Sequence, residues 1–318
     1  MPELPEVETV RRDLIRDKIP GNVICGAEIF WPRTLAIPTI VRFKKEIIGL
    51  QIKALSRRGK YLILELSGCG SRSLVPGSIF LIIHLRMSGR IEIRKNEPTK
   101  KHDRAKLILR DGREIVFHDT RKFGRWWLVK DLKQVVGRLG PEPFAETLTL
   151  EDFEGSLRKT NRMLKPLLLD QTFIAGLGNI YVDEALWLAK LHPKKNSGKL
   201  KKSEIKSLHE GILKAIQTGI KNLGTSLGKS EVNFYSVAGR RGRNQDALNV
   251  FRRTGEPCPR CRARIERIVV SQRSTHFCPA CQKKRLLRSA ASLRAYASLA
   301  SDFSKRFFKG VEGYGEKS

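Results

Sequence analysis

Four cysteines near the C-terminus are the residues whose type and spacing point most directly to chemistry. They form two Cys-x-x-Cys pairs, Cys258 with Cys261 and Cys278 with Cys281. Two such pairs at this separation are typical of a tetrahedral zinc site, and four thiolates leave no coordination position open for a substrate. We therefore predict one structural Zn2+, with two redox pairs or free thiols as the alternative. Cys25 and Cys69 are isolated, which indicates a reducing compartment rather than a disulfide framework.

The first residues could supply a nucleophile. If Met1 is removed, Pro2 exposes a secondary α-amine that can form an iminium with a sugar aldehyde carbon. An α-amine has a pKa near ~8, against ~10.4 for lysine, so more of it is unprotonated at neutral pH. Glu3 and Glu6 follow directly and could donate or accept protons beside it. The alternative is an ordinary acidic start of a helix.

Further segments could contact a polyanion. Glycines and Asn179 precede an expected helix, where backbone N–H groups favour a phosphate, although an ordinary turn and helix cap would explain them equally well. Phe123 lies among basic residues and could wedge into a base stack, as could Met87, but taken alone both are better interpreted as core residues. The arginines between the cysteine pairs could bind phosphates or be solvated surface charges.

Apolar periodicity predicts the elements that carry these residues. Val7, Val10 and Leu14 recur at helical spacing, so the chain should open on a helix. Asp111-Gly112 should form a hairpin turn. Short apolar stretches predict a β-sandwich or barrel from about residue 45 to 130, with strands at 61–66, 79–85, 90–94, 106–110, 114–118 and 126–129.

The pattern becomes helical after Pro143. Helices are expected at 149–157, 163–170, 180–189 and 202–223. Residues 225–249 are polar and basic and should form a long flexible loop. The last residues, 286–318, have a weakly helical pattern followed by glycine-rich polar sequence, and disorder is the default expectation for such an end.

Composition limits the classes of protein that fit. The chain has 318 residues, with 62 Lys and Arg against 32 Asp and Glu and a net charge of +30. Such an excess repels itself in a compact state, so it is expected to serve a polyanionic partner. The longest apolar stretch, Ile79 to Ile83, is far shorter than the roughly 20 residues that span a bilayer. The acidic start lacks a secretory pattern, so we expect a cytoplasmic protein without membrane contact.

Taken together, these segments resemble the formamidopyrimidine-DNA glycosylases, a family of base-excision repair enzymes. The matching segments run in family order from residue 1 to about 283: MPELPEVETVRRDL, RRGKYLILEL, HLRMSG, HDTRKFG, KPLLLDQTFIAGLGNIYVDEAL and, closing the four-cysteine finger, SQRSTHFCPACQ. The start MPELPEVET favours the oxidised-purine branch over the sister endonuclease VIII branch. Residues 228–250, where the family's lesion-binding loop lies, do not match it one-to-one, and residues beyond 283 extend past the usual end of the family.

The resemblance implies an α+β multidomain fold. It places an N-terminal β-sandwich with flanking helices at 1–145, a helix–two-turn–helix domain with the lesion loop at 146–247 and a zinc β-ribbon at 248–285. The extension at 286–318 would be disordered or would add nonspecific DNA affinity. Duplex DNA with damaged bases would lie in a basic cleft between the two halves. We expect a nucleoid-associated monomer with no small-molecule cofactor.

The resemblance also implies residue roles. Pro2 would be the Schiff-base nucleophile at C1′, Glu3 would move protons during sugar ring opening, and Glu6 would order the site. Lys60 would assist β-elimination, and Arg273 would clamp the phosphates flanking the lesion and assist δ-elimination. The DNA contacts would be Met87, Arg121 and Phe123 in the hole left by the everted base, and His102, Lys165 and Asn179 along the backbone.

The implied activity is excision of oxidised purines such as 8-oxoguanine and formamidopyrimidines from duplex DNA, followed by β,δ-elimination. Such enzymes must flip the damaged base out of the duplex. Two alternatives stay open. An endonuclease VIII-type glycosylase for oxidised pyrimidines would share the chemistry. A non-enzymatic zinc-ribbon DNA-binding protein would explain the charge and the cysteines without requiring Pro2 and Glu3.

Overall fold

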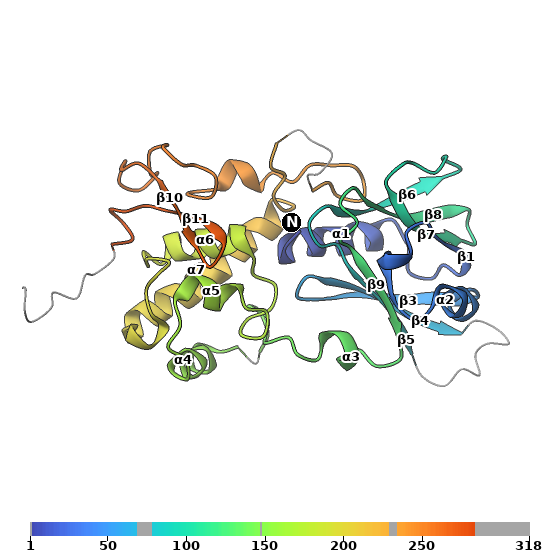
Figure 1. Cartoon of the computed structure of the whole chain (residues 1–318), viewed down its shortest axis with the longest axis horizontal. Helices are drawn as coiled ribbons and strands as arrows, with labels where there is room; N and C mark the ends of the chain where they lie inside the picture. Colours follow the sequence, from blue (N-terminus) through green and yellow to red (C-terminus); the bar gives the residue numbers. More distant parts are fainter. Residues whose placement is uncertain (1, 69–77, 147, 229–233, 284–318) are drawn as a thin grey trace, which may run out of the picture. The chain divides into compact units, whose positions relative to one another are not determined.

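Two β-sheets, a group of helices and a small two-stranded ribbon make up the described part of the chain (Figure 1). The computed structural model describes residues 2–68, 78–146, 148–228 and 234–283, which belong to one compact unit. The strands are β1 (Ile24–Ile29), β2 (Leu35–Ile37), β3 (Leu50–Arg58), β4 (Tyr61–Gly68), β5 (Ile79–His84), β6 (Gly89–Lys95), β7 (Asp103–Leu109), β8 (Arg113–Asp119), β9 (Arg125–Val129), β10 (Glu266–Val270) and β11 (Arg273–Phe277). The helices are α1 (Leu4–Arg16), α2 (Ile40–Ile47), α3 (Lys133–Val136), α4 (Leu150–Arg158), α5 (Leu164–Leu169), α6 (Asn179–Leu188) and α7 (Lys202–Lys221), with 3-10 turns η1 (Pro32–Thr34), η3 (Ser197–Lys199) and η4 (Asn244–Ala247).

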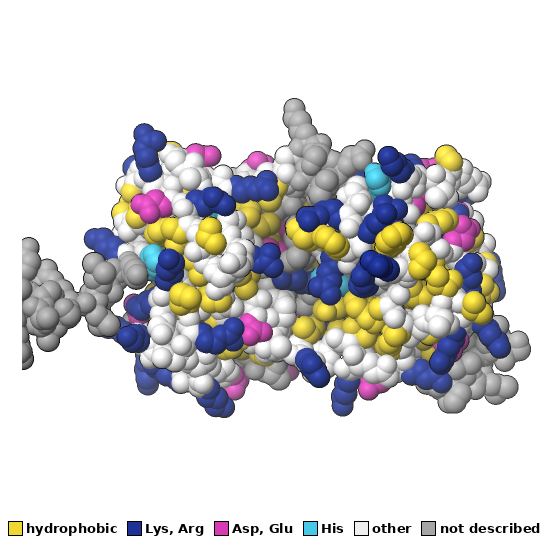
Figure 2. Space-filling view, in the orientation of Figure 1, with side chains coloured by type: hydrophobic (Ala, Val, Ile, Leu, Met, Phe, Trp, Pro, Cys, Tyr) yellow, Lys and Arg dark blue, Asp and Glu magenta, His cyan; other side chains and the backbone are white. Residues whose placement is uncertain are grey.

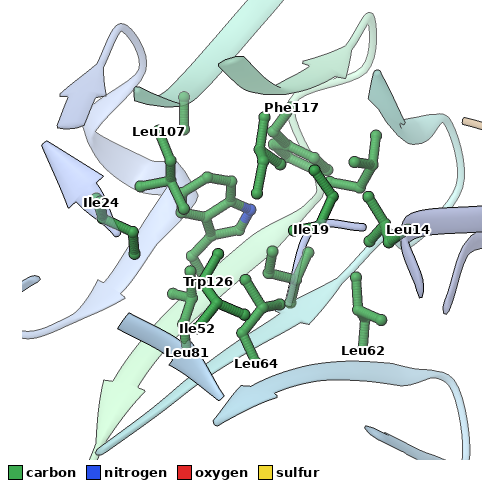
Figure 3. Packing of buried hydrophobic residues seen from close by; sticks show 14 of the residues in the cluster. Leu14, Ile19, Ile24, Ile52, Leu62, Leu64, Leu81, Leu107, Phe117 and Trp126 are labelled. Atoms are coloured by element: carbon green, nitrogen blue, oxygen red, sulfur yellow. The ribbon is translucent and has the colours of Figure 1, made fainter. Parts of the chain in front are cut away.

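The N-terminal half is a sandwich of two sheets. One is antiparallel with strand order β1-β7-β8-β6, and the other has the order β2-β9-β5-β4-β3, in which β2 runs parallel to β9. Trp126 of β9 points into the space between them, towards Leu107 and Phe117 of the facing sheet (Figure 3). On the outer face of the second sheet, Ile63 and Ile82 are also buried in a smaller cluster. Burial on both faces explains why β5 is almost continuously apolar.

Helix α1 connects this sandwich to the helical half. Val7, Val10 and Leu14 pack into the sandwich core. Leu4, in the first turn, belongs instead to the core built by α4 to α7, where it joins Tyr181. Because one helix contributes to both cores, the first residues of the chain are held at the junction between them.

The structure confirms most of the predicted elements. The opening helix, the six named strands, the four helices after Pro143 and the Asp111-Gly112 turn between β7 and β8 are present, with ends shifted by a few residues. The elements β1, β2, β3 and α2 lie outside the predicted strand and helix ranges. β2 has only three residues and β1 contains Gly26, whereas the buried Phe43 and Ile47 of α2 do recur at helical spacing although they were not recognised. Within 225–249 the described residues are irregular apart from η4, as expected of a loop. However, Phe234 and Val237 are buried in the sandwich core, so this part is anchored rather than free.

The predicted domain boundaries near residues 145 and 247 remain predictions. Side chains cross both, since Leu4 packs in the helical core from before residue 145 and Phe251 packs in the same core from beyond residue 247. The predicted extension at 286–318 lies outside the described residues. Among the described residues, no helix has the length and apolar content needed to cross a membrane.

The sandwich core gives a stability prediction. Trp126 is fully buried, so Trp126→Ala should lower the free energy of unfolding by about 3–5 kcal/mol through lost burial and a residual cavity. Val41, which is 81% exposed on α2, provides the control, and Val41→Ala should change stability by no more than about 0.5 kcal/mol. Urea unfolding followed by circular dichroism measures both. Similar midpoints for the two variants would contradict this description of the core.

Candidate active site and nucleic-acid interface

A cavity of about 770 Å³ opens where the N-terminus, the sandwich, the helical half and the cysteine ribbon meet. Its lining includes six of the residues predicted from sequence: Glu3, Lys60, Met87, Phe123, Asn179 and Arg273. Pro2 itself is buried directly beside this lining. Side chains separated by up to 270 positions are therefore brought to one cavity wall, where they combine carboxylate, amine, amide, guanidinium and apolar groups.

The carboxylate of Glu3 is bound by the N-terminus of α6. It accepts hydrogen bonds from the backbone N–H of Ile180 (3.0 Å) and of Tyr181 (3.4 Å). Gly178 makes this approach possible, because a Cβ there would overlap the Glu3 carboxylate. The sequence suggested that the glycines before this helix favour a bound phosphate. The structure corrects the identity of the anion, since the helix N-terminus holds the chain's own Glu3.

Glu6 lies one helical turn further and is also buried. Its carboxylate accepts hydrogen bonds from the Tyr181 hydroxyl (2.7 Å), from the backbone N–H of Thr225 (2.7 Å) and from the backbone N–H of Glu3 (2.7 Å). Burial and the neighbouring Glu3 raise the pKa of Glu6. These bonds join α1, α6 and the start of the 225–249 loop, which agrees with the predicted ordering role of Glu6.

Lys60 enters the cavity from the tight turn between β3 and β4. The turn is fixed from outside, because Glu142 accepts a hydrogen bond from the Gly59 N–H and pairs with Arg57 at 2.9 Å. The Lys60 side chain is almost completely buried. Desolvation lowers the pKa of Lys60, and the nearby carboxylates of Glu3 and Glu6 offset part of that shift. A lowered pKa makes the Lys60 ammonium a readier proton donor than an ordinary lysine.

The four sulfurs of the ribbon fit a tetrahedral metal. All four Sγ atoms lie within 4.8 Å of one another, with 3.4 Å between Cys261 and Cys278 and 4.0 Å between Cys258 and Cys281. Zinc with Zn–S bonds of about 2.3 Å requires sulfurs roughly 3.8 Å apart. The indole N–H of Trp187 on α6 donates to Cys258 Sγ at 3.4 Å, which is the outer hydrogen bond expected around a thiolate ligand.

Helix α6 also aligns the ribbon strand that carries Arg273. The amide of Asn179 donates to the Ser274 carbonyl at 2.9 Å, and Asp183 accepts a hydrogen bond from the His276 N–H at 2.9 Å. The Oδ1 atom of Asn179 is buried and has no hydrogen-bond partner among the described residues. Arg273 itself is exposed at the cavity mouth, where a phosphate can reach it.

The predicted DNA contact of Lys165 does not fit the structure. Its side chain is fully buried, and Nζ pairs with Asp183 Oδ1 at 2.5 Å and donates to the Asn179 carbonyl. A buried ammonium must keep such a partner, and Lys165 has no exposed surface on which to present its charge to a phosphate. Lys165 instead neutralises Asp183 beneath the Asn179 and Arg273 region.

Met87 and Phe123 are exposed rather than core residues. Their exposed fractions are 38% and 46%, which overturns the interpretation favoured from sequence alone. The guanidinium of Arg121 stacks on the Phe123 ring at 4.9 Å, whereas Lys122 between them turns away to cover Trp31 at 4.1 Å. A positive φ of 61° at Lys122 produces this divergence.

His102 lies outside the cavity lining. It is partly exposed, and its Nδ1 lies 3.1 Å from Arg104 Nη2. Its role in binding a DNA backbone remains a prediction.

Sequence reasoning did not assign a role to several cavity residues, among them His84, Arg86, Arg125 and Arg252. Burial lowers the pKa of His84 to about 3, so its neutral ring accepts a hydrogen bond from the Arg86 N–H at 2.9 Å. The position of His84 within the HLRMSG segment was the available signal. Arg252 follows a loop with no recognisable pattern, so nothing in the sequence marks it.

Comparisons with known proteins agree with this arrangement. Three family descriptions match: the formamidopyrimidine-DNA glycosylase N-terminal domain over residues 1–126, the formamidopyrimidine-DNA glycosylase H2TH domain over 139–231, and the zinc finger found in FPG and IleRS over 255–284. The formamidopyrimidine-DNA glycosylase of Protochlamydia amoebophila is 47% identical over 89% of this chain and all of that protein. That of Lactococcus lactis subsp. lactis is 44% identical over 89% of this chain and all of that protein.

Solved structures are similar over the same span. A complex of a Lactococcus lactis FPG mutant with Fapy-dG DNA has a TM-score of 0.79 at 41% identity, covering 89% of this chain and all of that one. A complex of MutM with DNA containing carbocyclic 8-oxo-G has a TM-score of 0.78 at 41% identity with the same coverage. The fold is therefore the expected α+β arrangement with an H2TH domain, and the four cysteines hold one structural zinc. The chain belongs to the formamidopyrimidine-DNA glycosylase family.

Proposed function

We propose that this protein excises oxidised purines, including 8-oxoguanine and formamidopyrimidines, from duplex DNA and then cuts the abasic strand. One observation carries the proposal. Buried Pro2 is followed by Glu3 in the wall of a cavity that also presents Lys60 and Arg273. The relatives are formamidopyrimidine-DNA glycosylases, and the solved complexes contain DNA with Fapy-dG or 8-oxo-G. A non-enzymatic DNA-binding protein would not need this set of groups.

DNA binding begins with charge and shape. Figure 2 shows Lys and Arg side chains spread across the viewed face, with exposed apolar side chains among them. Basic groups bind the phosphates, while the exposed Met87, Arg121 and Phe123 fill the space that an everted nucleotide leaves. Eversion costs a few kcal/mol, which these inserted side chains offset.

The chemistry then takes place at the sugar. With Met1 removed, the Pro2 nitrogen attacks C1′, the bond from C1′ to the base breaks, and the base leaves with the electron pair and takes up a proton. Glu3 takes the proton that the Pro2 nitrogen loses on attack and delivers it to the ring oxygen as the sugar opens to the iminium. The hydrogen bonds that Glu3 accepts from the N-terminus of α6 keep its carboxyl at the attacked carbon.

Strand cutting follows from the iminium. β-Elimination removes a proton from C2′ and breaks the C3′–O bond, and Lys60 provides a nearby group for this proton transfer. δ-Elimination removes a proton from C4′ and breaks the C5′–O bond, and Arg273 binds the phosphate that leaves. Water then hydrolyses the imine and frees Pro2. The zinc leaves no coordination position for substrate, so it holds the ribbon that bears Arg273. Because the substrate is chromosomal DNA, we place the enzyme in the nucleoid-bearing cytoplasm.

The nucleophile can be identified directly. Borohydride treatment during turnover on a duplex with one 8-oxoguanine should cross-link DNA to Pro2, as peptide mapping would show. Pro2→Gly keeps an α-amine and should retain part of the trapping, whereas a variant that keeps Met1 should lose it. A duplex with thymine glycol tests the pyrimidine alternative. Full trapping with Met1 retained would refute the role of Pro2.

Lys60 should act in strand cutting more than in binding. Lys60→Ala should slow single-turnover cutting of abasic DNA by about 10²-fold or more, because proton transfer loses its partner. The dissociation constant for DNA should change by less than about tenfold, since one phosphate contact is lost at most. Lys53→Ala, at an exposed position of β3, the strand that leads into the Lys60 turn, is the control. A loss of affinity alone would make Lys60 a phosphate contact only.

Removing the zinc should weaken DNA binding. Chelation unfolds a four-thiolate ribbon and so releases Arg273 from α6. We expect at least a tenfold loss of affinity, or about 1.4 kcal/mol, recovered when zinc is added back. Fluorescence anisotropy with metal-free and reconstituted protein measures it. Equal affinity in both forms would argue against a role of the ribbon in holding DNA.

A further inference from the structure

The two loops that carry the wedge side chains meet at one buried carboxylate. Met87 lies in the turn between β5 and β6, and Arg121 and Phe123 lie in the loop between β8 and β9. Asp119, the last residue of β8, has no exposed surface and sits between these loops. The site residues described above do not include it.

Each carboxylate oxygen of Asp119 accepts hydrogen bonds from the loops that carry Met87, Arg121 and Phe123, here called the wedge loops. Oδ1 accepts hydrogen bonds from the Ser88 hydroxyl (2.5 Å) and from the Arg121 N–H (3.1 Å), while Oδ2 accepts one from the Gly124 N–H (2.8 Å). Ser88 Oγ in turn accepts a hydrogen bond from the Arg121 N–H at 3.2 Å. Ser88 adjoins Met87, and Arg121 and Gly124 enclose Phe123, so one side chain connects both loops at their bases.

The backbone around this carboxylate leaves little room for adjustment. Gly89 pairs with Asp119 across β6 and β8, and a Cβ at Gly89 would lie 2.8 Å from the Phe117 ring. A Cβ at Gly124 would overlap the same ring. Among the described residues Asp119 forms no ion pair, so its charge is stabilised by oriented N–H and O–H groups. Such a network has one low-energy arrangement.

We propose that Asp119 is a positioning residue that presets the Met87 and Arg121–Phe123 loops as one rigid unit for insertion into the duplex. This inference rests on the proposed function, because it assigns Asp119 to the eversion step. Asp119 touches neither the sugar nor the cavity. Its effect should therefore be confined to steps that require insertion, and cutting at a sugar that is already accessible should proceed without it.

The test uses Asp119→Asn, which keeps the size of the side chain. Whichever way the amide lies, its NH2 faces the N–H of Arg121 or of Gly124, so one loop loses its support. Asp111→Asn is the matched control, because Asp111 is an exposed turn carboxylate that accepts a hydrogen bond from the Arg113 N–H at the opposite end of β8. Ser88→Ala is a milder second variant in case Asp119→Asn does not fold, as thermal melting would show.

Two reactions separate insertion from chemistry. The first reaction uses a duplex with one 8-oxoguanine. Stopped-flow fluorescence of an adjacent 2-aminopurine monitors eversion, and single-turnover kinetics monitor base excision. Asp119→Asn should slow both by about tenfold to a hundredfold, as misplaced groups commonly do. In the second reaction, Asp119→Asn should change the rate of cutting at a preformed abasic site in single-stranded DNA by less than about threefold. The control Asp111→Asn should change the rate of either reaction by less than about threefold. Equal losses in the two reactions, or no loss in either, would overturn the proposal.

A double-mutant cycle with Phe123→Ala makes the mechanism specific. If Asp119 acts through the wedge, Asp119→Asn should add little to the loss already caused by Phe123→Ala. Losses that multiply would assign Asp119 a general structural role and refute the proposal, while the proposed function would stand. If Phe123→Ala alone leaves eversion unchanged, the wedge itself fails and the role of Asp119 fails with it.

Discussion

The bond between the Glu3 carboxylate and the N-terminus of α6 is the interaction on which the rest of the structure depends. It joins the third residue of the chain to residues 180 and 181, across the boundary between the sandwich and the helical half. Two backbone N–H groups and the helix dipole stabilise the buried carboxylate there. Burial lowers the pKa of nearby Lys60, and the Glu3 carboxylate held at α6 offsets part of that shift.

Helix α6 extends this constraint to the zinc ribbon. The backbone at its start binds Glu3, and Asn179 binds the Ser274 carbonyl. Further along, Asp183 binds the His276 N–H and Trp187 binds Cys258. A zinc held by the four cysteines would therefore fix the ribbon strand that carries Arg273 to the cavity wall. Lys165 serves the same helix, since its buried ammonium balances Asp183 rather than meeting DNA. A catalytic cavity assembled from three parts of the chain thus shares one rigid element.

Much of the fold and part of the site could be predicted because the signals are local. Alternating and helical apolar patterns located most strands and helices, and the cysteine spacing alone indicated the zinc. Short elements such as β2 escaped, since three residues carry no periodicity. Met87 and Phe123 were misjudged from local sequence because an apolar side chain does not reveal which side of a loop it faces.

The sequence by itself determined the chemical groups: four thiolates in two pairs, a proline followed by glutamate, and an excess of positive charge. The tertiary structure alone decided which anion occupies the α6 N-terminus, which lysine stays buried and which carboxylate joins the two wedge loops. These choices depend on partners up to 178 positions apart, and no local pattern encodes such a distance. Burial then fixes each of these pairings, because a polar group removed from water must keep the partner that the fold gives it.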